Sequence, residues 1–342
     1  MRWVVTVAYL SCVVASGAAE LSESRWYKIS PRTHHRKLIR VQFELPLQDS
    51  FSQTEPEVQY HRVRERRKVY LPDDRIAVNP ATFGRQYPFS TVVSVSTGCS
   101  GSIVANFWVL TAAHCLWHNG LYKSGFFFLH IRHLNERGQF DHVDFIVDTF
   151  IPEQWMNRST EAGDQWANYD YALLKIEKRR GVQPWGTRYG KMELGLSVGA
   201  QNGLGRLVEM VGFADDKPSN SSWYVYCFVI DTTRDLLLFE CDAATGMSGS
   251  MVYTKEFDCN RTTYVRRVIG VLSGIRYSAR QNREYNAVIR FNPKTYIEIC
   301  SIMGEERRCR DRYFYYFNTA TPQTQRQYCL LDEVKHYRSL YG

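Results

Sequence analysis

From residue 87 onward the chain is a succession of short apolar runs separated by turn residues. The runs are rich in Val, Ile, Phe and Tyr, residue types that favour extended strands, and few stretches show the spacing of a helix. Many short strands at this spacing indicate a β-barrel or a β-sandwich. The runs span residues 89–96, 102–104, 108–112, 125–131, 143–150, 171–176, 207–213, 223–230, 236–239, 251–253, 264–272 and 287–291.

One helix is predicted after the last run. Asn292 is a favourable N-cap, Pro293 suits the first helical position and Gly304 is a typical helix end. Between them, apolar side chains recur at the spacing of one helical face, at Tyr296, Ile299, Cys300 and Met303. We therefore expect a helix over residues 293–303 that packs one face on the last barrel, followed by a basic and aromatic tail over 305–342.

The beginning of the chain has the layout of a secretory signal peptide over residues 1–19. Arg2 is followed by an apolar run and then by small residues. The run is too short to span a bilayer, and no later segment approaches about 20 uninterrupted apolar residues, so we expect no membrane anchor. The mature protein is expected to be soluble, secreted and extracellular.

A polar, basic segment interrupted by prolines follows, and we expect a loosely structured pro-segment over residues 20–67. It ends in an R-x-R-R sequence directly before an apolar stretch. Proprotein convertases of the secretory pathway cut after this kind of sequence. A solvated basic run is the alternative, but the position between a leader and a folded body favours processing after Arg67.

The cysteine count supports the same compartment. Cys12 lies in the signal peptide, which leaves eight of the nine cysteines, an even number that argues for disulfides. N-x-[ST] sequons at Asn157, Asn220 and Asn260 are candidate glycosylation sites in surface loops. The cysteine and histidine spacings do not resemble a zinc site, and we expect no metal and no cofactor.

The formal net charge is +8, but half of this excess lies in Arg2 and residues 20–67. The remaining body is only mildly basic. Short basic clusters such as residues 307–310 more often form a solvated face than a polyanion site. We therefore expect no nucleic-acid partner.

Ser248 lies in the sequence G-M-S-G-S, between Gly246 and Gly249. A serine hydroxyl becomes a nucleophile only when a tight turn presents it to a base and turns backbone N–H groups toward the developing oxyanion. On its own, such a Gly/Ser cluster is more often an ordinary turn. Its weight depends on whether a base and an acid are present elsewhere in the chain.

Both are found upstream. His114 ends a strand-like run, and the small residues before it leave room around an imidazole, which takes and returns a proton near neutral pH. A lone histidine is usually structural, but a bridge between Cys99 and Cys115 would clamp its loop. Asp170 begins a buried-looking strand, where a carboxylate needs a hydrogen-bond donor such as the N–H of His114 to stay ionised. The order His114, Asp170, Ser248 is that of the chymotrypsin arrangement.

On these residues the chain resembles the trypsin-like serine proteases, most closely the group of secreted serine proteases 23 and 35. The resemblance covers roughly residues 87–304. It is carried by Y-P-F-S-T from Tyr87, S-T-G-C-S-G-S from Ser96, V-L-T-A-A-H-C from Val109, Y-D-Y-A-L-L from Tyr169, C-D to M-S-G-S from Cys241, and I-G-V-L-S-G from Ile269.

The resemblance implies an all-β fold of two six-stranded antiparallel β-barrels, chymotrypsin-like, with the C-terminal helix. Within a protease domain over residues 68–304, the first barrel would cover about 85–195 and the second about 205–291, with a link near 191–204. It also implies disulfides, which would pair Cys99 with Cys115, Cys227 with Cys241 and Cys300 with Cys309; Cys259 and Cys329 would form a fourth.

The resemblance assigns roles to the site residues. Ser248 would be the nucleophile, His114 the general base and then acid, and Asp170 the residue that orients the imidazole. The backbone N–H groups of Gly246 and Ser248 would form the oxyanion hole. Substrate-binding residues would line the primary specificity pocket, with Asp242 at its floor and one wall made by Ser273, Gly274 and Ile275. Asp242 there predicts a preference for Arg or Lys before the scissile bond, although it also fits the end of a turn.

Two departures from the family pattern change what we expect of activation. Most trypsin-like enzymes carry Asp directly before the nucleophile and Gly-Pro soon after it, whereas this chain has Met247 and then Ser250-Met251. Met247 cannot form a buried ion pair with a new N-terminus. We therefore expect the oxyanion loop to be formed in the precursor or ordered by other contacts, so that removal of the leader mainly unblocks the cleft.

The sequence thus predicts a secreted serine endopeptidase that hydrolyses peptide bonds through an acyl-enzyme intermediate. Its partners would be protein or peptide substrates and a processing proprotein convertase. The alternative is a catalytically weak or inactive protease-fold binding protein. The serine at position 248 favours the enzyme.

Overall fold

The computed structural model describes residues 19–46, 68–118, 120–123, 129–157, 166–197, 204–258, 261, 263–305 and 309. Most of the predicted signal peptide, the processing site Arg67, the sequon at Asn260 and nearly all of the predicted tail lie outside the described residues.

Six antiparallel strands close the first barrel, in the order β11-β6-β5-β4-β9-β10, with β10 also paired to β11. The long strand β10 bends at register shifts, which lets its first half pair with β9 and its second half with β11. The strands are β4 (Val92–Val95), β5 (Cys99–Ala105), β6 (Trp108–Thr111), β9 (His130–Leu134), β10 (Phe140–Pro152) and β11 (Ala172–Ile176).

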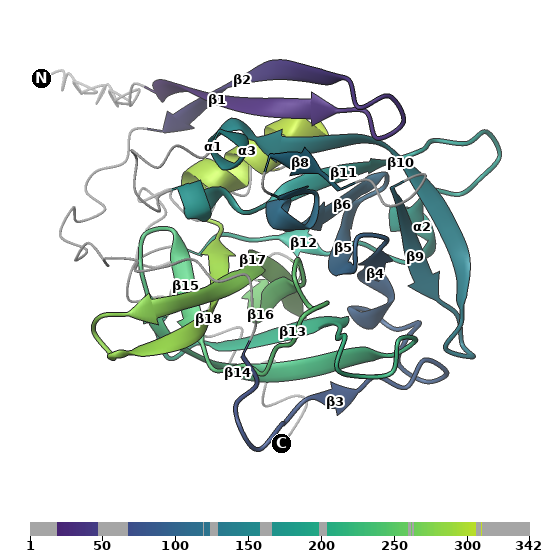
Figure 1. The fold of residues 1–342 in the computed structure, drawn as a ribbon, viewed down its shortest axis with the longest axis vertical. Helices are drawn as coiled ribbons and strands as arrows, with labels where there is room; N and C mark the ends of the chain where they lie inside the picture. The colour runs from purple at the N-terminus through teal and green to yellow at the C-terminus, as the bar shows by residue number, and fades with distance from the viewer. Residues whose placement is uncertain are drawn as a thin grey trace, which may run out of the picture.

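Six further strands close the second barrel, in the order β17-β16-β13-β14-β15-β18, with β17 paired to β18. The two barrels lie side by side in Figure 1. The predicted fold of two six-stranded antiparallel barrels is confirmed. The strands are β13 (Leu207–Phe213), β14 (Ser222–Thr232), β15 (Leu236–Phe239), β16 (Met251–Asp258), β17 (Thr263–Ser278) and β18 (Arg283–Arg290).

Short elements complete the fold. They are β3 (Ile76–Ala77), which pairs with β14, the pair β7 (Trp117–His118) and β8 (Leu121–Tyr122), the helices α1 (Glu153–Met156) and α2 (Trp185–Arg188), and the 3-10 turns η1 (Phe89–Thr91) and η2 (Ala113–Cys115).

Helix α3 (Pro293–Met303) has the predicted bounds. The Asn292 side chain accepts a hydrogen bond from the Thr295 N–H at 3.0 Å, and Gly304 ends the helix with φ 72°. Among the described residues, no helix combines the length and the apolar character needed to cross a membrane.

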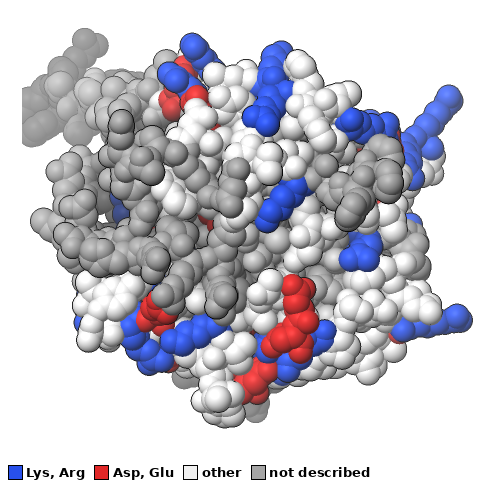
Figure 2. Space-filling view, viewed as in Figure 1, with Lys and Arg blue, Asp and Glu red and all other residues white. Residues whose placement is uncertain are grey.

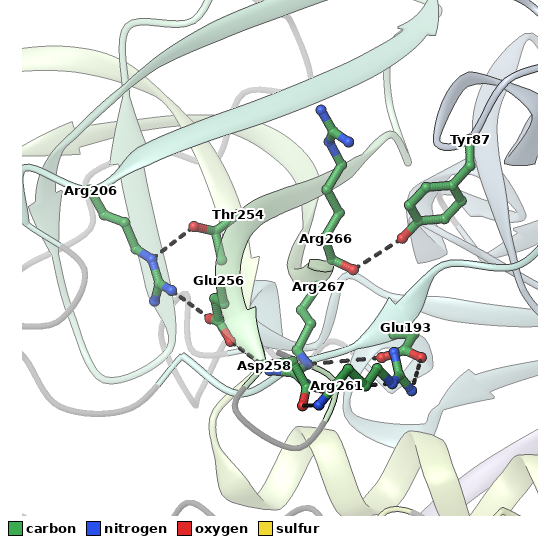
Figure 3. Close-up of polar contacts among 9 residues, drawn as sticks. All are labelled: Tyr87, Glu193, Arg206, Thr254, Glu256, Asp258, Arg261, Arg266 and Arg267. Carbon is green, nitrogen blue, oxygen red and sulfur yellow. Dashed lines mark hydrogen bonds and ion pairs between the residues drawn. The ribbon is translucent and has the colours of Figure 1, made fainter. Parts of the chain in front are cut away.

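The strand β12 (Glu193–Leu194) lies in the link between the barrels and is fixed to the second barrel by charge pairs (Figure 3). It runs parallel to β17, and Arg267 of β17 lies 3.1 Å from Glu256 and 2.6 Å from Asp258. Arg261 in turn donates to Glu193 at 2.8 Å. A buried guanidinium needs such carboxylate partners, so the network holds the link against the β16–β17 hairpin.

The segment expected to be loosely structured, residues 20–67, contains a β-hairpin, so that expectation was wrong for residues 20–46. Strands β1 (Ala19–Ile29) and β2 (Arg36–Pro46) pair with each other, and β1 extends the first sheet along β10. Figure 1 shows the purple hairpin across the first barrel, with α3 beside it. Trp26 and Ile29 are fully buried. The charged residues Arg25 and Lys28 beside these apolar positions obscured the strand pattern in the sequence.

The described Lys and Arg side chains are scattered over the face shown in Figure 2, and several lie beside Asp or Glu. Elsewhere in the fold, an ion pair joins Lys217 Nζ to Asp73 Oδ2 at 2.8 Å. This arrangement adds no argument for a polyanion partner.

Candidate active site

The first barrel positions His114. Strand β6 ends at Thr111, and the 3-10 turn η2 then places the imidazole at the edge of the barrel, where His114 is 5% exposed. A disulfide joins Cys115 of this turn to Cys99 at the start of β5, with a Cα–Cα distance of 6.1 Å. The turn that carries the histidine is therefore tied to the neighbouring strand.

Asp170 lies just before β11 and accepts two hydrogen bonds from His114. The backbone N–H donates to Oδ1 at 2.8 Å, and ring Nδ1 lies 2.8 Å from Oδ2. Burial alone would raise the pKa of Asp170, but the attraction of His114 and the hydrogen bonds it receives bring that pKa below its ordinary value. An ionised carboxylate only accepts, so Nδ1 of His114 carries a proton and donates it to Asp170.

Ser273 contributes a third hydrogen bond to the same carboxylate. Its Oγ donates to Asp170 Oδ2 at 2.5 Å. Ser273 lies at a register shift in β17, where Leu272 and Gly274 pair with consecutive residues of β18. This bulge makes Ser273 the extra residue of its strand and re-aims its side chain toward the first barrel.

Ser248 lies in the turn that precedes β16, and two glycines with positive φ shape this turn. Gly246 has φ 92° and Gly249 has φ 80°. A Cβ on Gly249 would lie 2.2 Å from Thr111 Oγ1, so only glycine lets the turn approach the strand that leads to His114. The N–H of Met247 bonds the Ala244 carbonyl at 3.1 Å, and the N–H of Gly249 bonds the Leu272 carbonyl at 3.0 Å. These bonds fix the turn on both sides of Ser248.

Ser100 of β5 joins the two barrels at this turn. Its N–H donates to the Ser248 carbonyl at 2.8 Å, and its Oγ donates to the Gly246 carbonyl at 2.8 Å. Its own carbonyl accepts from Thr111 Oγ1 at 2.8 Å. The structure therefore brings Ser248 to the same barrel junction as His114 and Asp170. Ser100 lies in the motif that begins at Ser96, but no site role was predicted for it.

The residues predicted to bind substrate lie on two segments. Strand β17 holds Ser273, Gly274 and Ile275 at consecutive positions, and Ser273 lies beside Asp170. Asp242 is 1% exposed, and its carboxylate accepts the backbone N–H groups of Tyr70 and Asp74. These donors come from the segment that follows the predicted processing site, and the sequence contained no local signal for this contact.

The expected disulfide pairs Cys99–Cys115, Cys227–Cys241 and Cys300–Cys309 are present. Cys259 and Cys329 lie outside the described residues. Potential metal ligands gather at Cys99, His114 and Cys115. The two cysteines are joined in a disulfide and offer no thiolate, so we infer no metal role for this group.

Two closed barrels with a histidine, an aspartate and a serine at their junction define a chymotrypsin-like protein. The chain belongs to the trypsin family of serine proteases, because the family model described as Trypsin matches residues 76–297.

Individual relatives fall into two groups. Serine protease 23 of Homo sapiens is 32% identical, over 72% of this chain and 67% of that protein. Inactive serine protease 35 of Macaca mulatta is 28% identical, over 89% of this chain and 86% of that protein. A solved structure of Glu endopeptidase is 17% identical with a TM-score of 0.49, over 68% of this chain and 96% of that chain. Since one of these relatives is named as inactive, membership of the family leaves turnover to be tested.

Proposed function

We propose that this protein is a secreted serine endopeptidase with Ser248 as nucleophile, His114 as general base and acid, and Asp170 as the orienting carboxylate. The observation that carries the proposal is the pair of hydrogen bonds from His114 to a buried, ionised Asp170. This arrangement fixes the ring so that Nε2 accepts a proton.

In the proposed reaction, Ser248 Oγ attacks the peptide carbonyl carbon and His114 Nε2 takes the hydroxyl proton. The backbone N–H groups of Gly246 and Ser248 stabilise the oxyanion. His114 returns the proton to the leaving amine, and an acyl-enzyme on Ser248 remains. Water activated by His114 then releases the acid and restores the serine.

A protease-fold binding protein without turnover is the second candidate, and the relative named inactive serine protease 35 favours it. The serine at position 248 argues for turnover. A fluorophosphonate probe, which reacts with an activated serine, separates the two functions.

The experiment labels protein purified from the medium of secreting cells. We expect labelling of the wild type and none of Ser248→Ala, while His114→Ala and Asp170→Ala keep only a residual rate of about 10³ to 10⁴ over water. Ser250→Ala is the matched control, because the Ser250 hydroxyl is buried in the same turn and forms no hydrogen bond within the described part of the chain, so its loss should leave activity unchanged. Normal peptide hydrolysis by Ser248→Ala would reject the nucleophile. Folded wild-type protein without labelling or turnover would favour the binding protein.

The proposal includes secretion, cleavage after Arg67 by a proprotein convertase and protein or peptide substrates. Asn157 and Asn220 are exposed, which suits the proposed glycosylation. We also propose that the Ser273–Ile275 stretch of β17 lines the primary specificity pocket. Mass spectrometry of the secreted protein tests the new N-terminus and the glycans together.

A further inference from the structure

Residues 68–77, here called the strap, are attached to the second barrel next to the loop that leads to Ser248. The Lys68 carbonyl accepts the Ala243 N–H at 3.1 Å and the Asn286 Nδ2 group at 2.6 Å. The Lys68 N–H donates to Asn286 Oδ1 at 2.9 Å. Asn286 Nδ2 also donates to the Cys241 carbonyl at 2.9 Å, so one buried amide clamps the strap and residues 241–243 together.

Asp242 holds the next part of the strap. Its Oδ1 accepts the Tyr70 N–H, and its Oδ2 accepts the Asp74 N–H at 2.8 Å. A carboxylate that is 1% exposed needs such donors, and here the backbone of the strap supplies them. Asp242 therefore has a structural partner in the chain itself, before any substrate binds.

The strap also contacts the loop that contains Asp215 and Asp216, which lies on the other side of Gly246. The Arg75 side chain is fully buried and donates to Asp216 at 2.5 and 2.9 Å. The adjacent Asp215 donates its N–H to the Thr245 carbonyl at 2.7 Å, and its Oδ1 lies 2.5 Å from the position that a Cβ on Gly246 would occupy. The Arg75–Asp216 pair thus supports the loop that packs against Gly246.

Apolar packing replaces a carboxylate at the position before the nucleophile. Met247 is fully buried in the core cluster of the second barrel, and Val69 of the strap packs against that cluster. None of these contacts requires a free α-amino group.

We propose that the strap positions the loop carrying Gly246 and Ser248, with Asp242, Asn286 and the Arg75–Asp216 pair as positioning residues. Asp242 is then not the recognition group for a basic side chain before the scissile bond. The proposal rests on the proposed function and names what orders its oxyanion loop. It also implies that the loop carrying Gly246 and Ser248 has its active conformation before cleavage after Arg67.

The first test compares Asp242→Ala and Asp242→Asn with the wild type on substrates that differ only in the residue before the scissile bond. Asp242→Ala should lower kcat at least about tenfold whichever residue precedes the scissile bond, with KM little changed. The fluorophosphonate labelling rate should fall by a similar factor, because the geometry of the loop sets both rates. Asp242→Asn keeps one acceptor oxygen and should recover part of the loss. Asp148→Asn, in a surface pair with Lys28, is the control.

The opposite result would follow if Asp242 recognised a basic side chain of the substrate, because the neighbouring carboxylates of Asp74 and Asp242 would attract a cation. If both variants lose cleavage after Arg and Lys while labelling and other cleavages stay normal, Asp242 is the recognition group and the proposal is overturned.

Hydrogen exchange tests the strap independently of turnover. Asp242→Ala and Arg75→Lys should each increase exchange at least about tenfold in the amides of residues 243–249, whereas Asp148→Asn should not. Unchanged protection in this loop would overturn the proposal. A wild type that neither labels nor hydrolyses peptides, but shows the expected exchange, would contradict the proposed function and leave the role of the strap intact.

An Arg67→Ala precursor tests the timing. It should react with a small fluorophosphonate within about twofold of the cleaved protein. Labelling that requires cleavage, and disappears when the new α-amino group is acetylated, would show that an N-terminal switch and not the strap orders the loop.

Discussion

The backbone N–H of Ser100, in the first barrel, donates a 2.8 Å hydrogen bond to the carbonyl of Ser248, in the second. The Ser100 hydroxyl donates to the Gly246 carbonyl and accepts the Phe213 N–H, each at 2.8 Å. One fully buried serine therefore sets the position of the turn that carries Ser248 relative to the barrel that carries His114.

Ser100→Ala removes only the hydroxyl and leaves two buried backbone groups without this partner. We expect a loss of about 1–3 kcal/mol in the free energy of unfolding and a lower kcat, since an unsatisfied buried group bears its full desolvation cost. Urea unfolding and peptide turnover measure both effects. Ser102→Ala, on the same strand, is the control. Equal losses of stability and kcat in the two variants would argue against the role of the Ser100 hydroxyl in joining the barrels.

Acid unfolding should report the hydrogen bonds to Asp170. Because the folded pKa of this carboxyl lies below its unfolded value of about 3.9, its stabilising contribution is complete above that pH and is lost as the pH falls toward the folded pKa. Ser273→Ala removes one donor, which should raise the folded pKa and cost about 1.5–3 kcal/mol at neutral pH. The acid unfolding midpoint should move to higher pH. An unchanged midpoint would contradict this role of Ser273.

Glu298 of α3 should have the opposite pH dependence. Burial raises its pKa from 4.5 to about 7, although its carboxylate accepts the Tyr171 hydroxyl at 2.7 Å and has Lys294 at 3.9 Å. The folded state therefore holds a proton that the unfolded state releases, and stability falls as the pH rises from 4.5 to 7.

Glu298→Gln removes this titration. It should stabilise the protein by about 3 kcal/mol at pH 8 and by little near pH 5, where wild-type Glu298 is still protonated in the fold. Thermal unfolding across this range makes the comparison, with Glu136→Gln on an exposed turn as control. Parallel stability curves for Glu298→Gln and wild type would show that the buried carboxyl does not titrate as expected.

The β1–β2 hairpin of the leader should remain bound after cleavage at Arg67, which differs from the expectation from the sequence that removal of the leader unblocks the cleft. Strand β1 extends the first sheet, and Trp26 packs edge-on against Tyr171, the residue after Asp170, with ring centroids 5.5 Å apart. We expect the leader fragment to co-elute with the body in gel filtration and to separate only in denaturant. Trp26→Ala should cost about 3–5 kcal/mol, whereas Leu38→Ala, 40% exposed on β2, should cost much less. Release of the fragment under native conditions would contradict this prediction.

The sequence alone determined the features that depend on local residue type and period. The runs of β-branched and aromatic residues predicted the strands, and Asn292, Pro293 and Gly304 marked the ends of α3, because caps act within a few residues. The triad candidates were found because each lies in a short motif whose chemistry is readable locally: a histidine after small residues, a carboxylate before a buried strand and a serine between glycines.

Only the tertiary structure decided which distant groups share an environment. The bulge that turns Ser273 toward Asp170 is a matter of register between β17 and β18, which no single strand encodes. The carboxylate of Asp242 meets N–H groups about 170 residues earlier in the chain, at Tyr70 and Asp74. Charged residues hid the strand pattern around Trp26 in the sequence. Trp26 is a core residue only because its strand packs on the first barrel. Hydrogen bonds and burial depend on distances in space and not on separation along the chain. These contacts can therefore be identified only from the packed arrangement of the two barrels and the strap.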